Sequence, residues 1–269
     1  MSRRRDLQKK LESLKEIEDI MTAMKHLAFM ETRKLSAFIS AQQFAVRTIE
    51  RAAGDSTHFY AIDAGKKKLT EIALLIGSER GLCGDYNERL LEAADPAFPF
   101  VSIGSRLEAA RENRLILIEG PTVAEDVEQV MTEIVDYLAM LQSQLPENEA
   151  LGITTYYHSD ETHGVRKRRL LPLPQSQTAV SFSHEPHLDL DPAQFYEKLS
   201  EHYLYAALHE ALYSALMVEN KYRLDHMEHA IGQLDKRIEK LDQRCNLLRQ
   251  EEITEEIEVI MLSVEALAD

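Results

Sequence analysis

The C-terminal part of the chain is a long stretch almost free of helix-breaking residues. After Pro192 it contains no further proline, and Gly232 is its single glycine. Apolar residues between positions 227 and 248 recur at alternating steps of four and three, which keeps one narrow apolar seam on a supercoiled helix. The seam consists of Met227, Ile231, Leu234, Ile238, Leu241, Cys245 and Leu248. This pattern predicts one continuous helix over residues 192–269 that pairs with another helix.

The N-terminal part has the same character and supplies the partner helix. No glycine precedes Gly54 and no proline precedes Pro96. One face at helical spacing is apolar, and it consists of Leu7, Leu11, Leu14, Ile17, Met21, Met24, Ala28, Leu35 and Phe38. The pattern predicts a helix over residues 1–53. Since both helices leave the same intervening domain, we expect them to form an antiparallel coiled coil.

The middle of the chain, residues 69–175, has the alternating pattern of an α/β domain. Three short apolar runs each end in glycine: IALLIG (72–77), FPFVSIG (98–104) and RLILIEG (114–120). Helical stretches follow them at residues 86–94, 105–113 and 122–144. Strands that alternate with helices predict a parallel, Rossmann-like sheet covered by helices. The predicted fold class is therefore α/β plus long α.

Two further strands are expected before the second long helix. Residues 150–159 and 168–174 are predicted to form a hairpin at the sheet edge, since Pro172 and Pro174 fit an edge or an exit better than a central strand. Asp191 is expected to cap the long helix, with Pro192 in its first turn.

Composition excludes several classes of protein. The net charge of -15 argues against nucleic-acid binding, which needs a basic surface. No apolar run approaches the ~20 residues that a membrane-spanning helix requires, and the N-terminus lacks the apolar stretch of a signal peptide. Two cysteines far apart in the sequence indicate a cytosol-like compartment rather than a disulfide framework.

The two predicted helices differ in length, which leaves an uncovered tip at about residues 250–269. Six apolar residues line one face of this tip: Ile253, Ile257, Ile260, Met261, Val264 and Leu267. Burial of each such side chain is worth about 1.5–3 kcal/mol. Five glutamates between positions 251 and 258 also lie near a helix C-terminus, where the dipole disfavours acids. We expect a partner that sheathes the tip; the alternatives are a tip that folds back or a bundle of identical tips.

The sequence carries no convincing catalytic, cofactor or metal motif. SERGLCGDYN (78–87) lies between a strand and a helix, the usual place for phosphate binding. Its glycines do not spell GxGxxG, and no lysine followed by Ser or Thr completes a P-loop. His226 and His229 could share a metal, but no third ligand is evident. We therefore expect no active site, no cofactor and no metal.

Taken together, motifs along the whole chain resemble the gamma subunit of F-type rotary ATP synthases. SERGLCGDYN is similar to that family's glycine-rich signature, and RRLLPLP (168–174) to its strand before a long loop. The N-terminal part matches at Ile20, Ala23 and Met24. The C-terminal part matches at Glu219, Arg223, Met227, Ala230, Asn246, Arg249, Gln250, Ile253, Thr254, Glu256 and Ile257. With no transit segment in view, a divergent member of bacterial or archaeal type is expected.

The resemblance implies a non-catalytic subunit of an ion-translocating complex. Such a subunit is a central rotor shaft inside a ring of three alpha and three beta subunits. Its α/β domain rests on the membrane ring of c subunits, with the epsilon subunit alongside. It couples ion flow through the c-ring to ATP synthesis or hydrolysis at the alpha/beta sites, as a peripheral protein at the cytoplasmic face of the plasma membrane. By the same resemblance, contacts with the alpha/beta ring are expected at Met24, Arg223, Gln250, Ile253, Thr254, Glu256 and Ile257.

Two other interpretations remain open from the residues alone. A coiled-coil scaffold or adaptor protein with an α/β domain shares the seam but gives no reason for an apolar tip; it would be a stable homo-oligomer. A nucleotide-using enzyme with a Rossmann-like middle domain would bind ATP or NAD at micromolar concentration through residues 69–175.

Overall fold

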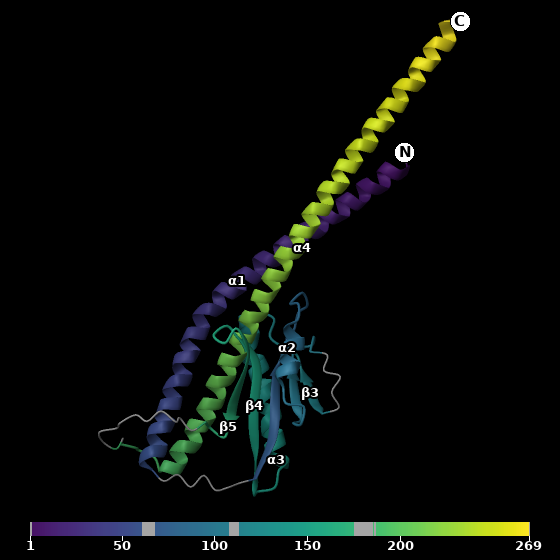
Figure 1. Ribbon diagram of the computed structural model, residues 1–269. Helices are drawn as coiled ribbons and strands as arrows, with labels where there is room; N and C mark the ends of the chain where they lie inside the picture. Colours follow the sequence, from purple (N-terminus) through teal and green to yellow (C-terminus); the bar gives the residue numbers. More distant parts are fainter. Residues whose placement is uncertain (1, 61–67, 108–112, 175–184, 186, 269) are drawn as a thin grey trace. The chain divides into compact units, whose positions relative to one another are not determined.

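The computed structural model describes residues 2–60, 68–107, 113–174, 185 and 187–268. Contacts divide the chain into two compact units. We call residues 28–223 the core unit, and residues 1–27 with 224–269 the terminal unit. The two long helices, α1 (Ser2–Phe59) and α4 (Pro192–Ala268), each contribute to both units (Figure 1).

Both long helices were predicted, and their ends refine the prediction. α1 continues past residue 53 to Phe59. α4 begins at Pro192, and the Asp191 carboxylate accepts a hydrogen bond from the Ala193 amide at 3.1 Å. The expected cap is confirmed, because this bond satisfies one of the amides that the first turn of a helix leaves without an internal partner.

A five-stranded mixed sheet forms the centre of the core unit (Figure 1). Its strands are β1 (Lys68–Ile76), β2 (Phe100–Ile103), β3 (Arg114–Ile118), β4 (Glu149–Ser159) and β5 (Gly164–Leu171). In the order β3-β2-β1-β4-β5, every neighbouring pair is parallel except β4 and β5. The predicted edge hairpin is present, but its second strand runs over Gly164–Leu171 and not over residues 168–174. Both prolines after Leu171 therefore lie beyond its end.

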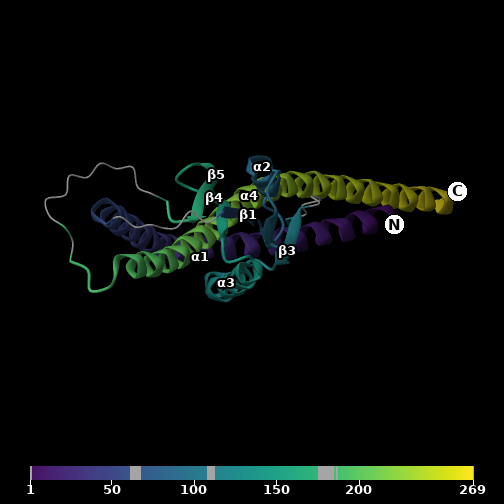
Figure 2. The same ribbon diagram turned by 90° about the horizontal axis from the view of Figure 1, so that it is seen from below.

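Side-chain alternation along β1 separates two hydrophobic clusters, one on each face of the sheet. Ala73 and Leu75 pack in the cluster that contains Leu90 of α2 (Tyr86–Ala93). Ile72 and Leu74 belong to the larger cluster, which joins α3 (Val127–Gln144) to α1 and α4. A short 3-10 helix, η1 (Ala124–Asp126), leads into α3. Figure 2 shows α2 and α3 on opposite sides of the sheet.

The helix predicted over residues 105–113 is wrong in its described part. Residues 105–107 form a turn, and residues 108–112 lie outside the described part of the chain. The Ser105 amide donates to the Glu79 carboxylate at 2.8 Å, and the Arg106 amide donates to the Ser78 carbonyl at 3.1 Å. These long-range bonds hold the chain after β2 in a turn that local propensity does not specify.

The inward face of α1 in the terminal unit differs from the predicted apolar face. Leu14 and Met21 are half-buried as predicted, but Ile17 is 45% exposed and Met24 is 36% exposed. Glu18 takes the half-buried position between Leu14 and Met21. A step of four from Leu14 reaches residue 18, so Ile17 lies beside the half-buried row rather than on it.

Candidate functional site

The predicted seam residues are the least exposed side chains of their stretch of α4. Met227 and Cys245 are buried, and the other five are half-buried. Every residue between them is exposed except Ala230, which is half-buried. A partly covered row at steps of three and four is typical of a helix packed along one side.

Two ion pairs within the terminal unit give the direction of the helices that it contains. The Arg4 guanidinium lies 2.5 Å from the Glu252 carboxylate, and the Lys25 ammonium lies 3.0 Å from the Glu228 carboxylate. Arg4, early in α1, pairs with a late residue of α4, whereas Lys25, later in α1, pairs with the earlier residue Glu228. The two segments therefore run antiparallel.

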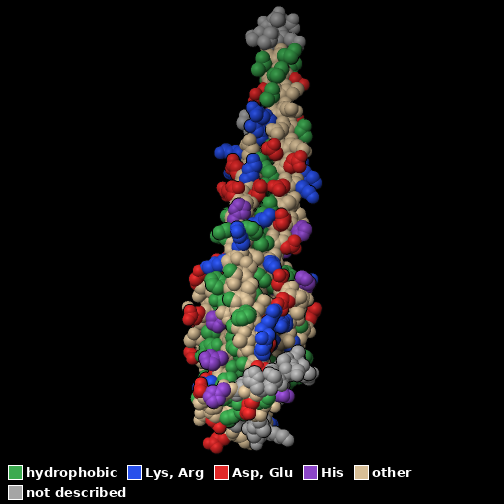
Figure 3. Space-filling model, turned by 90° about the vertical axis from the view of Figure 1, so that its left-hand side faces the viewer, with side chains coloured by type: hydrophobic (Ala, Val, Ile, Leu, Met, Phe, Trp, Pro, Cys, Tyr) green, Lys and Arg blue, Asp and Glu red, His purple; other side chains and the backbone are tan. Residues whose placement is uncertain are grey.

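The tip predicted to meet a partner is an exposed, largely apolar helix end. Ile253 and Ile257 are 46% and 52% exposed, and Gln250, Thr254 and Glu256 are also exposed. Further on, Val259, Ile260, Met261 and Leu262 are each more than half exposed. Figure 3 shows hydrophobic side chains gathered toward the C-terminal end of α4. Among the predicted contact residues, this group offers its side chains to a partner most openly.

A second exposed apolar row lies on α1 around the predicted contact residue Met24. Ile17, Ile20, Met24 and Leu27 follow one another at steps of three and four, and Leu27 is 65% exposed. Side chains at this spacing share one face of a helix. This row therefore presents Met24 within a continuous apolar surface.

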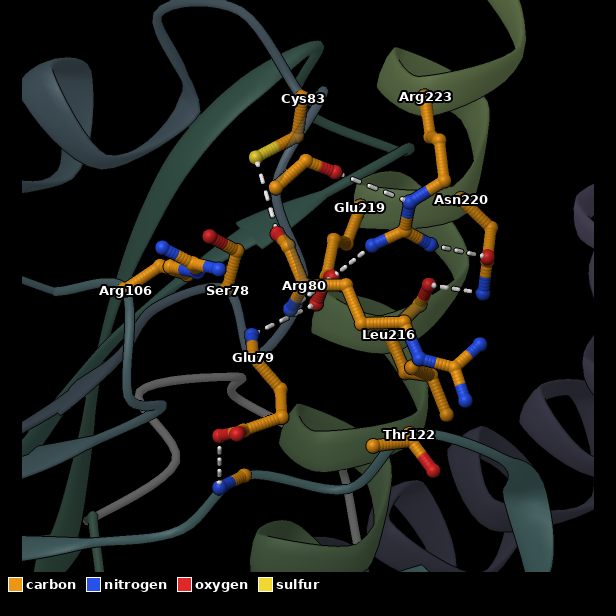
Figure 4. A network of polar contacts seen from close by, with 12 residues as sticks. Ser78, Glu79, Arg80, Cys83, Arg106, Thr122, Leu216, Glu219, Asn220 and Arg223 are labelled. Carbon is orange, nitrogen blue, oxygen red and sulfur yellow. Dashed lines mark hydrogen bonds and ion pairs between the residues drawn. The ribbon is translucent and has the colours of Figure 1, made fainter. Parts of the chain in front are cut away.

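Arg223, another predicted partner contact, lies inside the core unit instead of on its surface (Figure 4). Its guanidinium forms an ion pair with Glu219, in which each side chain is 4% exposed. Arg223 also donates to the Asn220 side chain at 2.7 Å and to the Gly81 carbonyl at 3.3 Å. Because its side chain is buried, Arg223 lacks the exposed surface that a docking partner needs. Its assignment as a partner contact stays a prediction.

Carboxylates of the chain itself accept from two backbone amides of the glycine-rich turn and from two amides that lie beside it (Figure 4). Glu219 accepts from the Arg80 amide at 3.2 Å and from the Glu79 amide at 3.4 Å. The Glu79 carboxylate accepts from the Ser105 amide at 2.8 Å and from the Gly120 amide at 2.7 Å. In nucleotide-binding proteins, amides at this edge of a parallel sheet bind phosphate. Here the two glutamates take that place.

Burial controls the electrostatics of this turn. Desolvation raises the pKa of the Glu219 carboxyl, while Arg223 and the Arg80 amide act in the opposite direction. Burial also raises the pKa of the Cys83 thiol, which favours the less reactive protonated form. The buried bonds of Glu219 with the amides of Glu79 and Arg80 hold this turn in place.

The described part of the chain contains neither a cluster of metal ligands nor a helix that could span a membrane. Within it, no three His, Cys, Asp or Glu side chains lie close enough together to hold a metal ion. None of its helices combines the length and the apolar character needed to cross a membrane. The His229 ring lies 3.8 Å from the Asp225 carboxylate, and both side chains are highly exposed.

Comparison with known proteins assigns the chain to a family. A family model described as ATP synthase matches residues 3–267. The chain belongs to this ATP synthase family. Relatives named ATP synthase gamma chain include one from Ruminococcus albus, 24% identical with 96% of each chain covered. Another, from Heliobacterium modesticaldum, is 25% identical with 98% of each chain covered.

Solved structures of ATP synthase share the fold. The rotor of the Euglena gracilis mitochondrial ATP synthase contains a chain with a TM-score of 0.60 and 16% identity; the match covers 93% of this chain and 98% of that one. A second Euglena gracilis structure, of OSCP, F1 and the c-ring, gives a TM-score of 0.58 at 18% identity, with 98% and 94% covered. The family's long helices at both chain ends and central mixed sheet are thus present in this chain.

The sequence indicates the half-buried row and the exposed tip of α4 but not the polar network of the core unit. Glu79 carried no predicted role, and Glu219 was noted only as part of the family pattern. The usable signal was a glycine-rich turn that lacks a phosphate motif, which indicates that some other acceptor satisfies its amides. The acceptors could not be named, because Glu219 lies 139 residues after Arg80 in the sequence.

Proposed function

We propose that this chain is the central rotor shaft of an F-type ATP synthase. It couples ion flow through a membrane c-ring to ATP synthesis or hydrolysis at sites of the alpha and beta subunits, with the epsilon subunit as a further partner. In the complex it is peripheral to the plasma membrane, at the cytoplasmic face. The three alpha/beta sites are alike, and the shaft presents a different face to each of them. A contact shifts the conformational equilibrium of a site by as much as its energy differs between the site's conformations, so the three sites differ from one another.

The exposed apolar tip of α4 is the observation that supports this function most strongly. Ile253 and Ile257 are about half exposed, and the more exposed Ile260 and Met261 follow them. A helix with such a surface gains stability when a partner covers it, about 1.5–3 kcal/mol for each fully buried side chain. Contacts of this kind are non-directional, so they suit a shaft that turns inside a sleeve.

The finer architecture follows from the same proposal. Residues 1–53 and 192–269 form an antiparallel coiled coil along the seam, and residues 69–175 form a Rossmann-like domain between them. The antiparallel ion pairs of the terminal unit and the half-buried seam support the coiled coil. Parallel strands β1 to β4 with helices on both faces support the Rossmann-like description.

Contacts with the alpha/beta ring are assigned to the exposed candidates. These are Met24 on α1 and Gln250, Ile253, Thr254, Glu256 and Ile257 on α4. Thr254 donates its hydroxyl to the Gln250 carbonyl at 2.9 Å, so its methyl group and the Gln250 amide remain available to a partner. A few polar contacts of this kind define resting angles on an otherwise apolar surface.

Reconstitution with alpha and beta subunits tests the proposal. The full chain should join them in a stable complex that hydrolyses ATP and, with the membrane sector, pumps ions. Removal of residues 250–269 should weaken assembly and torque and leave the fold of the core unit intact, as judged by thermal unfolding. Assembly and pumping that are unchanged by this truncation would contradict the role of the tip.

A further inference from the structure

We propose that Glu219 and Arg223 form a latch with turn residues 79–81 that fixes the rotational position of α4 on the sheet of the core unit. Torque carried by α4 then reaches the sheet through this latch. The inference rests on the proposed function as a shaft, and it names the residues that bear the load within it.

Nearer its N-terminus, the core-unit part of α4 contacts the sheet through apolar packing and a few polar bonds. These include the ion pair of Glu210 with Arg168 and the bond from the Tyr203 hydroxyl to the Arg169 carbonyl. The fully buried contacts of this part of α4 include Ala207, Ala211 and Ala215, together with Leu208 and Leu212. Apolar packing opposes separation but is non-directional. The alanines and flexible leucines of this face therefore offer few features that stop the helix from turning. The directional bonds at Tyr203 and Glu210 lie farther toward the N-terminus of α4 than Glu219 and Arg223.

The latch supplies directional bonds to that same helix. Glu219 accepts from the amides of Glu79 and Arg80, and the Nε of Arg223 donates to the Gly81 carbonyl at 3.3 Å. Hydrogen bonds weaken steeply when their angles change. Loss of one partner from a buried charged pair is also costly, because a charge is left without compensation. Rotation of α4 would break several of these bonds at once.

The turn is itself fastened to the ends of three strands. Ser78 follows β1, and its amide donates to the Asn87 side chain at 3.0 Å. The Glu79 carboxylate holds the amides of Ser105 and Gly120, which follow β2 and β3. A load on residues 79–81 is therefore distributed over the carboxyl ends of the parallel strands. Such a connected network is the physical requirement for mechanical coupling between two elements.

The place of the latch along α4 suits this role. Glu219 and Arg223 lie at the C-terminal end of the core unit's share of α4, and the same helix continues to Ala268. Torque that enters from the later part of the helix reaches Arg223 and Glu219 before it reaches the alanine-rich segment at 207–215.

The test compares Glu219→Gln with Glu71→Gln in the complete membrane-bound complex. Glu71 also pairs with an arginine, Arg169, but the pair lies within the sheet and not on α4. The measured quantity is the number of ions pumped per ATP hydrolysed. Glu219→Gln should lower this ratio about threefold or more while hydrolysis continues, and Glu71→Gln should leave it unchanged.

A double exchange separates the latch from a simple ion-pair effect. Glu219→Arg combined with Arg223→Glu retains opposite charges four residues apart, but an arginine cannot accept from the amides of Glu79 and Arg80. The latch predicts that the ratio stays low in this variant. Recovery of the wild-type ratio would overturn the latch, as would a wild-type ratio in Glu219→Gln.

If a variant fails to assemble into the complex, amide hydrogen exchange on the full-length chain still tests the latch. Exchange at Glu79 and Arg80 should accelerate in Glu219→Gln and stay as in the wild type in Glu71→Gln; equal rates in both would overturn the latch. A wild-type complex that hydrolyses ATP without pumping would overturn the proposed function instead, and the exchange comparison would still decide whether Glu219 holds the turn.

Discussion

The Nε2 atom of His158 lies 2.8 Å from the carbonyl oxygen of Tyr86, and both side chains are almost fully buried. Since a carbonyl only accepts, Nε2 carries the proton of the neutral ring. The other ring nitrogen, Nδ1, is buried and has no hydrogen-bond partner among the described residues. The two rings also lie against each other, with centroids 4.0 Å apart.

The burial of the His158 ring predicts a loss of stability at mildly acidic pH. Burial lowers the pKa of His158 below its ordinary value of 6.5, and the Arg89 charge acts in the same direction. The unfolded chain therefore binds the proton more readily than the folded chain. The contribution of His158 to the free energy of unfolding is fully present above pH 6.5 and declines as the pH falls through the lowered pKa.

Urea unfolding from pH 7.5 to 5 measures this decline. A His158→Gln variant, which does not titrate, should show a flatter pH dependence than the wild type. His209, whose pKa burial also lowers, is the control: His209→Gln should leave the His158 contribution in place. An imidazole signal of His158 that titrates in NMR spectra at or above pH 6.5 would contradict the prediction.

Gly104 should tolerate no side chain. Its φ is +106°, and a Cβ atom would lie 2.8 Å from the carbonyl oxygens of Gly77 and Ser78. Gly104→Ala should lower the free energy of unfolding by about 2–4 kcal/mol, from strain and steric overlap. Gly81→Ala is the matched control, since a Cβ there meets nothing within 4 Å, and it should change stability by about 0.5 kcal/mol or less. Equal effects in urea unfolding would contradict this.

Gly232 lies in the exposed interior of α4, where a Cβ atom has open space around it. Gly232→Ala should stabilise this part of the helix by about 0.5–1 kcal/mol, because alanine loses less backbone entropy than glycine. Amide exchange of the residues around position 232 should slow, while exchange in the core unit should not change. Faster exchange near position 232 would show that the helix requires flexibility or a close approach at this point.

The tip should matter for binding and not for folding. Ile253→Ser combined with Ile257→Ser should leave the thermal unfolding of the isolated chain unchanged, since both side chains are about half exposed. Affinity for the alpha/beta ring should fall about tenfold or more, as two apolar contacts are lost. Leu115→Ser with Leu117→Ser, at similarly exposed positions of β3, is the matched control and should retain the affinity. An equal loss of affinity in the two double variants would contradict a specific binding site for the tip within the alpha/beta ring.

The fold could be predicted largely because its elements are encoded locally. The absence of glycine and proline revealed the long helices, and the apolar runs that end in glycine revealed the first strands. β5 was harder, because its arginines and lysine hide the alternation of a strand. Arg168 pairs with Glu210, and Arg169 pairs with Glu71. The strand's charges are thus compensated by residues that a local pattern does not include.

The candidate site could be predicted where it depends on exposure along one helix, and not where it depends on distant partners. Ile253 and Ile257 were identified because nothing in the chain was left to cover them. Ile17 belongs to the predicted apolar face of α1, yet it is exposed, and Glu18 beside it is half-buried. Hydrophobic periodicity cannot distinguish an apolar residue kept for a partner from one that packs within the chain.

Rotation of the chain inside an alpha/beta ring is the most direct test of the account. Cys83 and Cys245 are buried, so Glu133→Cys on the exposed side of α3 provides a selective attachment point for an optical probe. With the ring fixed to a surface, ATP should drive the probe through continuous rotation in one direction. A complex that hydrolyses ATP while the probe stays at one angle would contradict the proposal that this chain is the shaft.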